Sequence, residues 1–171
     1  PHTFDLRERI GFYEHLCLTH GGIRFEDYDS VRRHMEQLLD WVDGLHRPQA
    51  LTHIDSNVDN FLFLSDGSVR LIDWEYTGMC DPILDIAMSA IYVYYTEEQA
   101  KKLAALYFER EPELLEWQVI QAYMALGAFL WTLWALYKEA VGDEFGEYTL
   151  IMYRYAKDYY KKLAAELPLT E

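Results

Sequence analysis

The stretch that decides the fold is Leu51–Asp73, which reads LTHIDSNVDNFLFLSDGSVRLID. Two short apolar runs, Phe61–Leu64 and Val69–Asp73, flank an Asp-Gly pair, and this arrangement is typical of a tight β-hairpin. The sequence therefore predicts a small hairpin in this stretch. The polar residues around its open end are the first candidates for a functional site.

Four polar side chains converge on that end of the predicted hairpin. His53 and Asp55 lie just before it, Asn60 follows the aspartate by five residues, and the second strand ends in Asp73. The spacing H-x-D-x-x-x-x-N, followed by a strand ending in Asp, matches the catalytic-loop pattern of kinases. In phosphoryl transfer one carboxylate orients or deprotonates the attacking hydroxyl, while an amide oxygen and a second carboxylate hold magnesium. Asp and Asn also cap turns, but motif, hairpin and terminal Asp together favour a kinase-like site.

Composition narrows the class of protein. A chain of 171 residues that is 51% hydrophobic can form one domain, or slightly more, with a substantial core. The net charge of −14 argues against a nucleic acid or an anionic membrane as partner. An acidic surface suits a cationic ligand, although solubility alone explains such a charge. The two cysteines, far apart in sequence, indicate neither a disulfide framework nor a metal site, so we expect a reducing, cytoplasmic setting.

The rest of the chain is predicted to be mainly helical. Asp81 is a natural N-cap for a helix beginning near Pro82, and Asp85, one turn later, can support the catalytic loop by hydrogen bonding. Apolar periodicity and capping signals predict the other helices. Asp5 is expected to cap the first helix, residues 96–99 to form a capping box, and an apolar stripe to lie on the inner face of the second helix. The expected helices cover residues 6–20, 28–45, 82–95, 96–109 and 148–166, and another begins at Pro112.

The helix expected after Pro112 is the most apolar part of the chain. No charged residue occurs between Gln118 and Tyr137, which is long enough for a transmembrane helix. Polar residues interrupt this run and no second span accompanies it, so a central helix buried on all sides is favoured. Trp131 and Trp134 lie on one face of it, where core packing is their simplest role.

These motifs together resemble the choline/ethanolamine kinase family, including the bacterial branch that makes phosphocholine for surface decoration. That family belongs to the larger aminoglycoside-phosphotransferase-like group within the protein-kinase-like superfamily. The resemblance covers residues 4–162, and its H-x-D-x-x-x-x-N portion is specific only to the superfamily. DWEY, W-x-x-W and EFG point to choline kinase. The segments that carry the resemblance are HIDSNVDN (53–60), LIDWEYTGMCDPILDIA (71–87), FLWTLWALYKEA (129–140) and EFGEY (144–148).

The resemblance implies a role for each candidate residue around the hairpin. Asp55 would be the catalytic base, and Asn60 and Asp73 would hold Mg²⁺. His53 would brace the catalytic loop. Asp81 and Asp85 would support the site from behind. ATP would be the phosphate donor.

The resemblance also implies a site for a small cationic amino alcohol. A trimethylammonium group has no hydrogen-bond donor, so aromatic faces and a nearby carboxylate are the means by which a protein holds it. Glu75 would add the compensating charge. The aromatic walls would come from Tyr76, Trp131, Trp134 and Tyr148.

The expected fold class is α+β and mostly helical: the C-terminal lobe of a protein-kinase-like (choline kinase/aminoglycoside phosphotransferase) fold with a small β-hairpin, over residues 1–171. Many relatives have Pro-Gly before the metal-binding Asn, whereas this chain has Val58-Asp59, which could alter the loop backbone. The sequence contains no Gly-rich phosphate loop, no strand lysine in a nucleotide-binding context and no glutamate partner for it. We therefore expect a piece of a longer kinase whose N-terminal nucleotide lobe is missing here, with little or no activity alone.

Three functions remain open at this point. The first is an ATP-dependent kinase for choline or ethanolamine. The second is a kinase for another hydroxylated compound, such as an aminoglycoside or thiamine. The third is a non-catalytic module that binds an amine or a partner protein. Intact Asp55, Asn60 and Asp73 argue against the third, because a degenerate site has no reason to keep all three chemical types.

Overall fold

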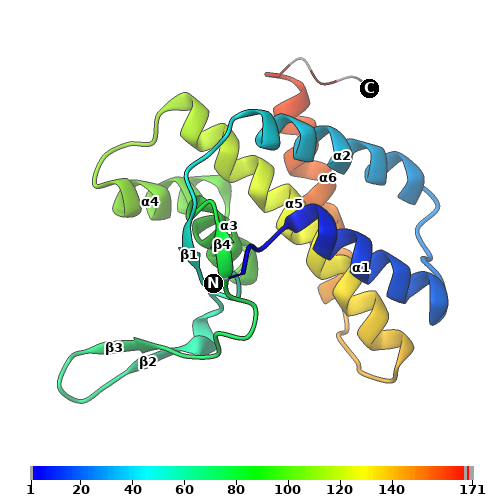
Figure 1. Cartoon of the computed structure of the whole chain (residues 1–171), viewed down its shortest axis with the longest axis horizontal. Helices are drawn as coiled ribbons and strands as arrows, with labels where there is room; N and C mark the ends of the chain where they lie inside the picture. The colour runs from blue at the N-terminus through cyan, green and yellow to red at the C-terminus, as the bar shows by residue number, and fades with distance from the viewer. Residues whose placement is uncertain (1, 168, 170–171) are drawn as a thin grey trace. The chain divides into compact units, whose positions relative to one another are not determined.

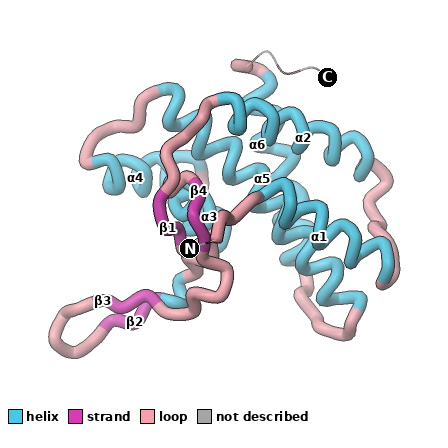
Figure 2. Tube along the Cα trace, in the orientation of Figure 1, coloured by secondary structure: helices cyan, strands magenta, loops and turns pink. Residues whose placement is uncertain are grey.

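The computed structural model describes residues 2–167 and 169, which are mostly helical with two short β-ribbons (Figures 1 and 2). The chain divides into two compact units. The first unit contains residues 2–4 and 47–123, and the second contains residues 5–46, 124–167 and 169. Helix α5 (Leu114–Ala140) contributes residues 114–123 to the first unit and 124–140 to the second.

A small sheet in the first unit joins segments that are distant in sequence. Strand β1 (Ala50–Thr52) pairs antiparallel with β4 (Gly78–Cys80). On the N-terminal segment, Thr3 forms a parallel bridge with Met79, and the Phe4 N–H donates to the Met79 carbonyl at 3.1 Å. No local pattern predicts β4, because Thr77-Gly78 and Asp81-Pro82 indicate an irregular turn there. Its strand conformation depends on these partners.

The predicted hairpin is present in the first unit. Strands β2 (Phe61–Phe63) and β3 (Val69–Leu71) pair antiparallel, and in Figure 1 they extend away from β1 and β4. In the turn, Gly67 has φ +81° and the Asp66 carboxylate accepts the Ser68 N–H at 2.9 Å. The positive φ explains why glycine stands there. Both strands are one or two residues shorter than the apolar runs suggested.

Two helices, α3 (Ile83–Tyr92) and α4 (Glu97–Phe108), pack together in the first unit. The predicted capping box of α4 is present: the Gln99 N–H donates to Thr96 Oγ1, and the Thr96 N–H donates to Gln99 Oε1. Helix α3 begins one residue later than expected, so its N-cap is Pro82 and not Asp81. Asp81 still accepts the Ile83 N–H, and its side chain therefore stabilises the first turn from outside the cap position.

The second unit contains α1 (Leu6–Thr19), α2 (Tyr28–Gly44) and α6 (Tyr148–Ala164), with α2 packed against α6. The Asp5 carboxylate caps α1 by accepting the Glu8 N–H at 3.0 Å, as predicted. The apolar stripe expected on α2 is buried in full. Its members are Val31, Met35, Leu38, Leu39 and Val42.

Helix α5 is long and apolar enough to cross a membrane by length and composition alone. Of its most apolar 18-residue window, 94% is buried inside the protein. A membrane-spanning helix would present that surface to lipid, so the burial favours the core helix expected from the sequence.

Candidate active site

The loop that follows β1 is held by one carboxylate of α3. Asp85 accepts the His53 N–H at 2.9 Å with one oxygen and the Ile54 N–H at 2.7 Å with the other. Ser56 adds a bond from its hydroxyl to the Asp85 carbonyl at 2.9 Å. Burial raises the pKa of Asp85, while the two backbone donors act in the opposite direction. The Asp85 side chain thus bonds the first two residues of the His53-Ile54-Asp55 segment to α3.

The backbone between His53 and Asp55 has an uncommon conformation. Ile54 has φ +73° and its side chain is fully buried. A β-branched residue in the left-handed region costs about 1–3 kcal/mol, and such strain is found where surrounding contacts over-determine the backbone. The Asp85 bond to the Ile54 N–H is one of these contacts.

Asn60 is hydrogen-bonded directly to Asp55. Its amide Nδ2 donates to the Asp55 carbonyl at 2.8 Å and to the carboxylate Oδ2 at 3.0 Å. Asn60 ends the 3₁₀ turn η1 (Val58–Asn60), and Asp59 has no positive φ. The Val58-Asp59 pair therefore does not require the backbone conformation that glycine would favour.

His53 is bonded to the backbone just before Asp73, at the open end of the hairpin. The His53 Nε2 lies 2.8 Å from the Ile72 carbonyl, which can only accept, so Nε2 carries the hydrogen. The other nitrogen, Nδ1, is buried with no hydrogen-bond partner among the described residues. Asp73 follows directly, is exposed, and has φ +62°. Because the Ile72 N–H donates to the Asn60 carbonyl at 3.0 Å, Asn60 and Asp73 share this end of the hairpin.

Glu75 and Tyr76 lie in the turn that leads from the hairpin to β4. Glu75 is exposed and Tyr76 is half-buried. The next residue, Thr77, donates its hydroxyl to the Thr52 carbonyl at 2.7 Å, which anchors the turn beside the start of the loop that follows β1. The structure therefore brings Glu75 and Tyr76 into the same unit as Asp55, Asn60 and Asp73.

Asp81 is buried and makes bonds that the sequence did not suggest. Arg47 Nε donates to its Oδ2 at 2.7 Å, and the Tyr123 hydroxyl lies 3.3 Å from the same oxygen. Arg47 stands before a proline with no periodic pattern around it, and Tyr123 lies within an apolar helix. No local signal identifies either one as a partner of Asp81.

The remaining candidates lie in the second unit and form an aromatic cluster of their own. Trp131 and Trp134 meet edge to face at 5.9 Å between ring centroids. Phe145 lies 5.0 Å from Trp134 and 6.1 Å from Tyr148, so it links the tryptophan pair to the tyrosine. Sequence reasoning did not list Phe145, although its position within EFGEY could have identified it. Trp131 is 3% exposed, while Trp134 and Tyr148 are half-buried.

The oxygen atoms of Asn60 and Asp73 at the hairpin are suitable ligands for a magnesium ion that is also bound by phosphates. Both bonds to Asp55 come from Asn60 Nδ2, which leaves the carbonyl oxygen of the same amide for a metal. Residues 2–167 and 169 contain no group of three or more His, Cys, Asp and Glu side chains that could hold a metal. Mg²⁺ is commonly held by one or two protein ligands with substrate phosphates and water, so Asn60 and Asp73 suffice.

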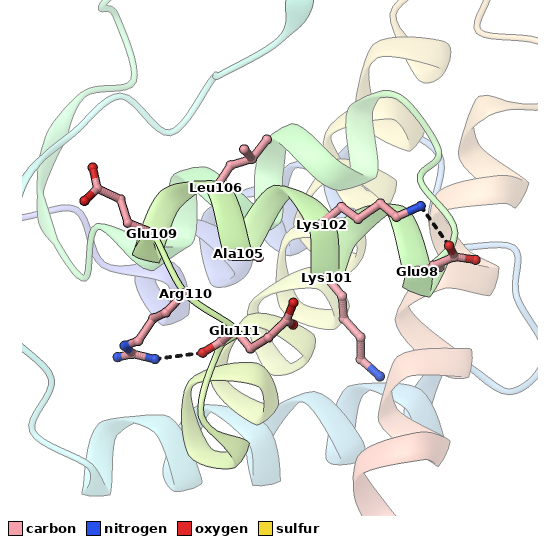
Figure 3. Close-up of a pocket in the computed structure, with 8 residues that line it drawn as sticks. All are labelled: Glu98, Lys101, Lys102, Ala105, Leu106, Glu109, Arg110 and Glu111. Atoms are coloured by element: carbon pink, nitrogen blue, oxygen red, sulfur yellow. Dashed lines mark hydrogen bonds and ion pairs between the residues drawn. The ribbon is translucent and has the colours of Figure 1, made fainter.

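A separate pocket lies beside α4 and the turn after it (Figure 3). Its cations have partners: Lys102 pairs with Glu98 at 2.8 Å, and Arg110 bonds the Glu111 carbonyl at 3.0 Å. None of the eight side chains drawn in Figure 3 belongs to the predicted site. This pocket therefore adds nothing to the candidate active site.

Residues 5–123 match the phosphotransferase enzyme family, and the chain belongs to this family. Protein LicA of Haemophilus influenzae is 34% identical over 104 residues, which are 57% of this chain and 39% of that protein. The crystal structure of choline kinase LicA from Streptococcus pneumoniae is similar with a TM-score of 0.81 at 29% identity, over 94% of this chain and 56% of that one. A LicA structure in complex with AMP gives a TM-score of 0.82.

A choline/ethanolamine kinase family protein from Mesorhizobium loti is similar with a TM-score of 0.77 at 26% identity, over 96% of this chain and 55% of that one. These comparisons confirm the resemblance to choline/ethanolamine kinases. They also confirm the predicted fold class, a mostly helical lobe with a small hairpin that corresponds to the C-terminal lobe of choline kinase folds. The chain spans about half the length of the solved relatives and 39% of the H. influenzae protein.

Proposed function

We propose that this chain is the C-terminal catalytic lobe of a choline-kinase-type enzyme, which transfers the γ-phosphate of ATP to the hydroxyl of choline or ethanolamine. The observation that carries the proposal is the bond between Asn60 Nδ2 and the Asp55 carboxylate at 3.0 Å, beside the hairpin end that bears Asp73. The similarity to choline kinase LicA supports the substrate class.

Asp55 is the catalytic base in this proposal. Its carboxylate accepts the proton of the substrate hydroxyl while that oxygen forms a bond to the γ-phosphorus. The bond from this phosphorus to the β–γ bridging oxygen breaks, so the products are the phosphorylated amino alcohol and ADP. The bond from Asn60 fixes the orientation of the carboxylate, which lowers the entropic cost of reaching the reactive geometry.

Asn60 and Asp73 are the proposed ligands of Mg²⁺. The bound ion would neutralise charge on the phosphate oxygens. Asn60 is oriented for this role because its nitrogen is engaged with Asp55. His53, through the Ile72 carbonyl, holds the backbone next to Asp73. The LicA structure in complex with AMP supports a nucleotide site in a related protein.

The aromatic cluster of the second unit is the proposed binding wall for the ammonium group. Trp131, Trp134 and Tyr148 are linked by Phe145, which we add to the set. Tyr76 and Glu75 are also proposed to contact the amino alcohol, the tyrosine through its ring and the glutamate through its charge. An ammonium over an aromatic face gains about 0.5–2 kcal/mol, and the methylated amine is favoured by degree because it makes no hydrogen bonds.

An N-terminal nucleotide-binding lobe of the same protein is the proposed partner, and this chain alone would turn over little or no ATP. The catalytic set described here contains the base and the metal ligands but no phosphate-cradling loop. A cytoplasmic setting, where ATP is abundant, and independence from nucleic acids and membranes are part of the same proposal.

The test is Mg-ATP turnover by the longer polypeptide that carries this chain, with choline, ethanolamine, thiamine and a panel of aminoglycosides. We expect turnover with choline or ethanolamine, and a loss of about 10³-fold in kcat for Asp55→Asn, because the base is removed while the shape of the side chain is kept. Asp59→Asn, which changes a neighbouring exposed carboxylate, is the matched control and should remain near wild type.

Three outcomes would contradict parts of this proposal. Turnover with an aminoglycoside or thiamine alone would keep the mechanism and replace the substrate. An active Asp55→Asn enzyme would remove Asp55 as the base. A folded polypeptide that binds Mg-ATP and never turns over any of these compounds would favour a binding module.

A further inference from the structure

A buried charge cluster around Asp81 lies next to the first turn of α3, and the roles given above include neither Arg47 nor Tyr123, which bond to it. Asp81 is 5% exposed, and both of its carboxylate oxygens are engaged. Oδ2 accepts from Arg47 Nε at 2.7 Å and lies 3.3 Å from the Tyr123 hydroxyl, while Oδ1 accepts the Ile83 N–H at 3.1 Å. Burial and the charge of Asp81 raise the pKa of Tyr123, so its hydroxyl stays protonated as a donor.

The cluster is connected to the catalytic loop through the first turn of α3. Asp81 binds the Ile83 N–H with its side chain and the Leu84 N–H with its carbonyl, at 3.1 and 3.0 Å. Asp85 comes next in the same turn, and its carboxylate holds the His53 and Ile54 amides. The position of the first turn of α3 therefore determines where the Asp85 carboxylate, which anchors the loop, lies.

In the contacts described for residues 2–167 and 169, Arg47 is the one cationic side chain that pairs with the Asp81 carboxylate. Its side chain is 21% exposed, against 3% for Asp81. A buried carboxylate that loses its cationic partner is left with an uncompensated charge, which is a strongly unfavourable state. Relief would come from movement of Asp81 towards water, which withdraws it from the Ile83 N–H.

We propose that Arg47 is a positioning residue, which fixes the catalytic loop through Asp81, the start of α3 and Asp85. Arg47 lies on the segment that enters β1, so the same ion pair also connects the chain before the loop to the helix behind it. Among the hydrogen bonds and ion pairs described for residues 2–167 and 169, none joins Arg47 to a candidate reacting group. The catalytic consequence of this role rests on the function proposed above, whereas the effect on the loop does not.

Amide hydrogen exchange of the chain tests the effect on the loop. Arg47→Gln should accelerate exchange at His53 and Ile54 by about tenfold relative to Ile91, a buried amide in the last turn of α3. Lys102→Gln is the control, because it breaks another cation–carboxylate pair of the same unit, Lys102–Glu98 at 2.8 Å, at the protein surface. In that variant the ratio of loop to Ile91 exchange should not change.

A double variant separates positioning from a general loss of stability. Arg47→Gln with Asp81→Asn leaves no buried charge, and the amide oxygen of residue 81 can still accept the Ile83 N–H. We expect loop exchange to return to within about threefold of wild type. If the single variant does not fold, recovery of a folded protein with a protected loop by the double variant supports the role, and an unprotected loop overturns it. Unchanged exchange in Arg47→Gln, or equal acceleration at His53, Ile54 and Ile91, also overturns it.

The catalytic consequence is measured in the longer polypeptide. Arg47→Gln should lower kcat by about tenfold and leave KM for choline nearly unchanged, and the double variant should restore kcat. A KM effect without a kcat effect contradicts loop positioning. If the wild-type polypeptide turns over no substrate, the proposed function fails while the exchange experiment still decides the role of Arg47.

Discussion

Asp27 illustrates how a single carboxylate makes stability depend on pH. It accepts the Tyr153 hydroxyl at 2.8 Å and pairs with Lys157, both from α6. The bond from Lys157 and the bond from Tyr153 hold the pKa of Asp27 below its ordinary value of 3.8, against a smaller effect of burial. Because the folded-state pKa lies below the unfolded one, the stabilisation is complete above pH 4 and is lost as pH falls through the folded pKa.

Asp27→Asn should therefore reduce the free energy of unfolding at neutral pH and have almost no effect under strongly acidic conditions. The pair is largely exposed, so the expected loss at neutral pH is only about 0.5 kcal/mol. Urea unfolding at both pH values measures it, with Asp158→Asn, an exposed carboxylate of α6, as the control for net charge. A loss that is the same at both pH values would mean that packing, and not the charge of Asp27, stabilises this contact.

At the residue scale the sequence identified groups with local signatures and missed those with distant partners. Asp55 and Asn60 follow a spacing motif, and the structure brings them into hydrogen-bond contact. Asp85 was expected near the loop because it follows a helix start by one turn. Arg47 could not be found in this way, because its partner is 34 residues away and burial, not spacing, makes the pair important.

At the scale of elements, β4 depends on a close approach that only glycine allows. A Cβ on Gly78 would lie 2.7 Å from Phe4 Cβ and 2.8 Å from the Phe4 nitrogen. Both atoms belong to the N-terminal segment that is bonded to β4, and the backbone nitrogen cannot move without breaking that pairing.

Gly78→Ala should destabilise the protein by about 1–3 kcal/mol, since the added methyl group forces the N-terminal segment away from β4. Gly11→Ala is the control with the opposite expected sign. A Cβ there meets nothing within 4 Å, and alanine favours a helix interior over glycine by about 0.5–1 kcal/mol. Thermal unfolding of both variants measures the two changes in stability. A neutral Gly78→Ala would show that residues 2–4 contribute little to the sheet.

The two β-ribbons also show which strand pairs could be predicted from the sequence. The β2–β3 hairpin is local, with an Asp-Gly turn between its strands, so its own sequence is sufficient to predict it. The β1–β4 pair joins residues more than twenty positions apart, and three-residue strands carry too little alternation to be detected. Helices were found reliably because apolar periodicity and caps agree, with errors of one to three residues at the helix ends.

The whole molecule carries a net charge of −14, which predicts a simple response to salt. Self-repulsion among the carboxylates opposes the compact state, and salt screens it over a distance of about 10 Å at 0.1 M. Raising NaCl from about 10 to about 200 mM should increase Tm by a few degrees. A Tm that stays constant or falls would mean that favourable ion pairs outweigh the repulsion.

Choline chloride provides the matched comparison at equal ionic strength. It screens charge as NaCl does, so any additional rise in Tm reports binding of choline to the folded chain. An equal rise with both salts would indicate that this chain alone does not bind choline under these conditions.

At this scale the sequence led to the family and to the class of fold, because the motifs extend over most of the chain. The division of the chain into two compact units was not predictable. Asp55, Asn60 and Asp73 are in one unit, and Trp131 and Trp134 are in the other. Which residues form a compact unit depends on packing between distant segments, and periodicity within a segment contains no such information.

Asp73 combines a left-handed backbone conformation with a side chain that the proposed chemistry requires. Evolution for stability alone would replace it with glycine, which takes that conformation without cost but has no carboxylate. Asp at this position then provides catalytic activity at the expense of some stability of the fold. Directed evolution that selects only for thermal resistance should therefore drift towards inactive variants at position 73, and a combined screen for activity is needed to prevent it.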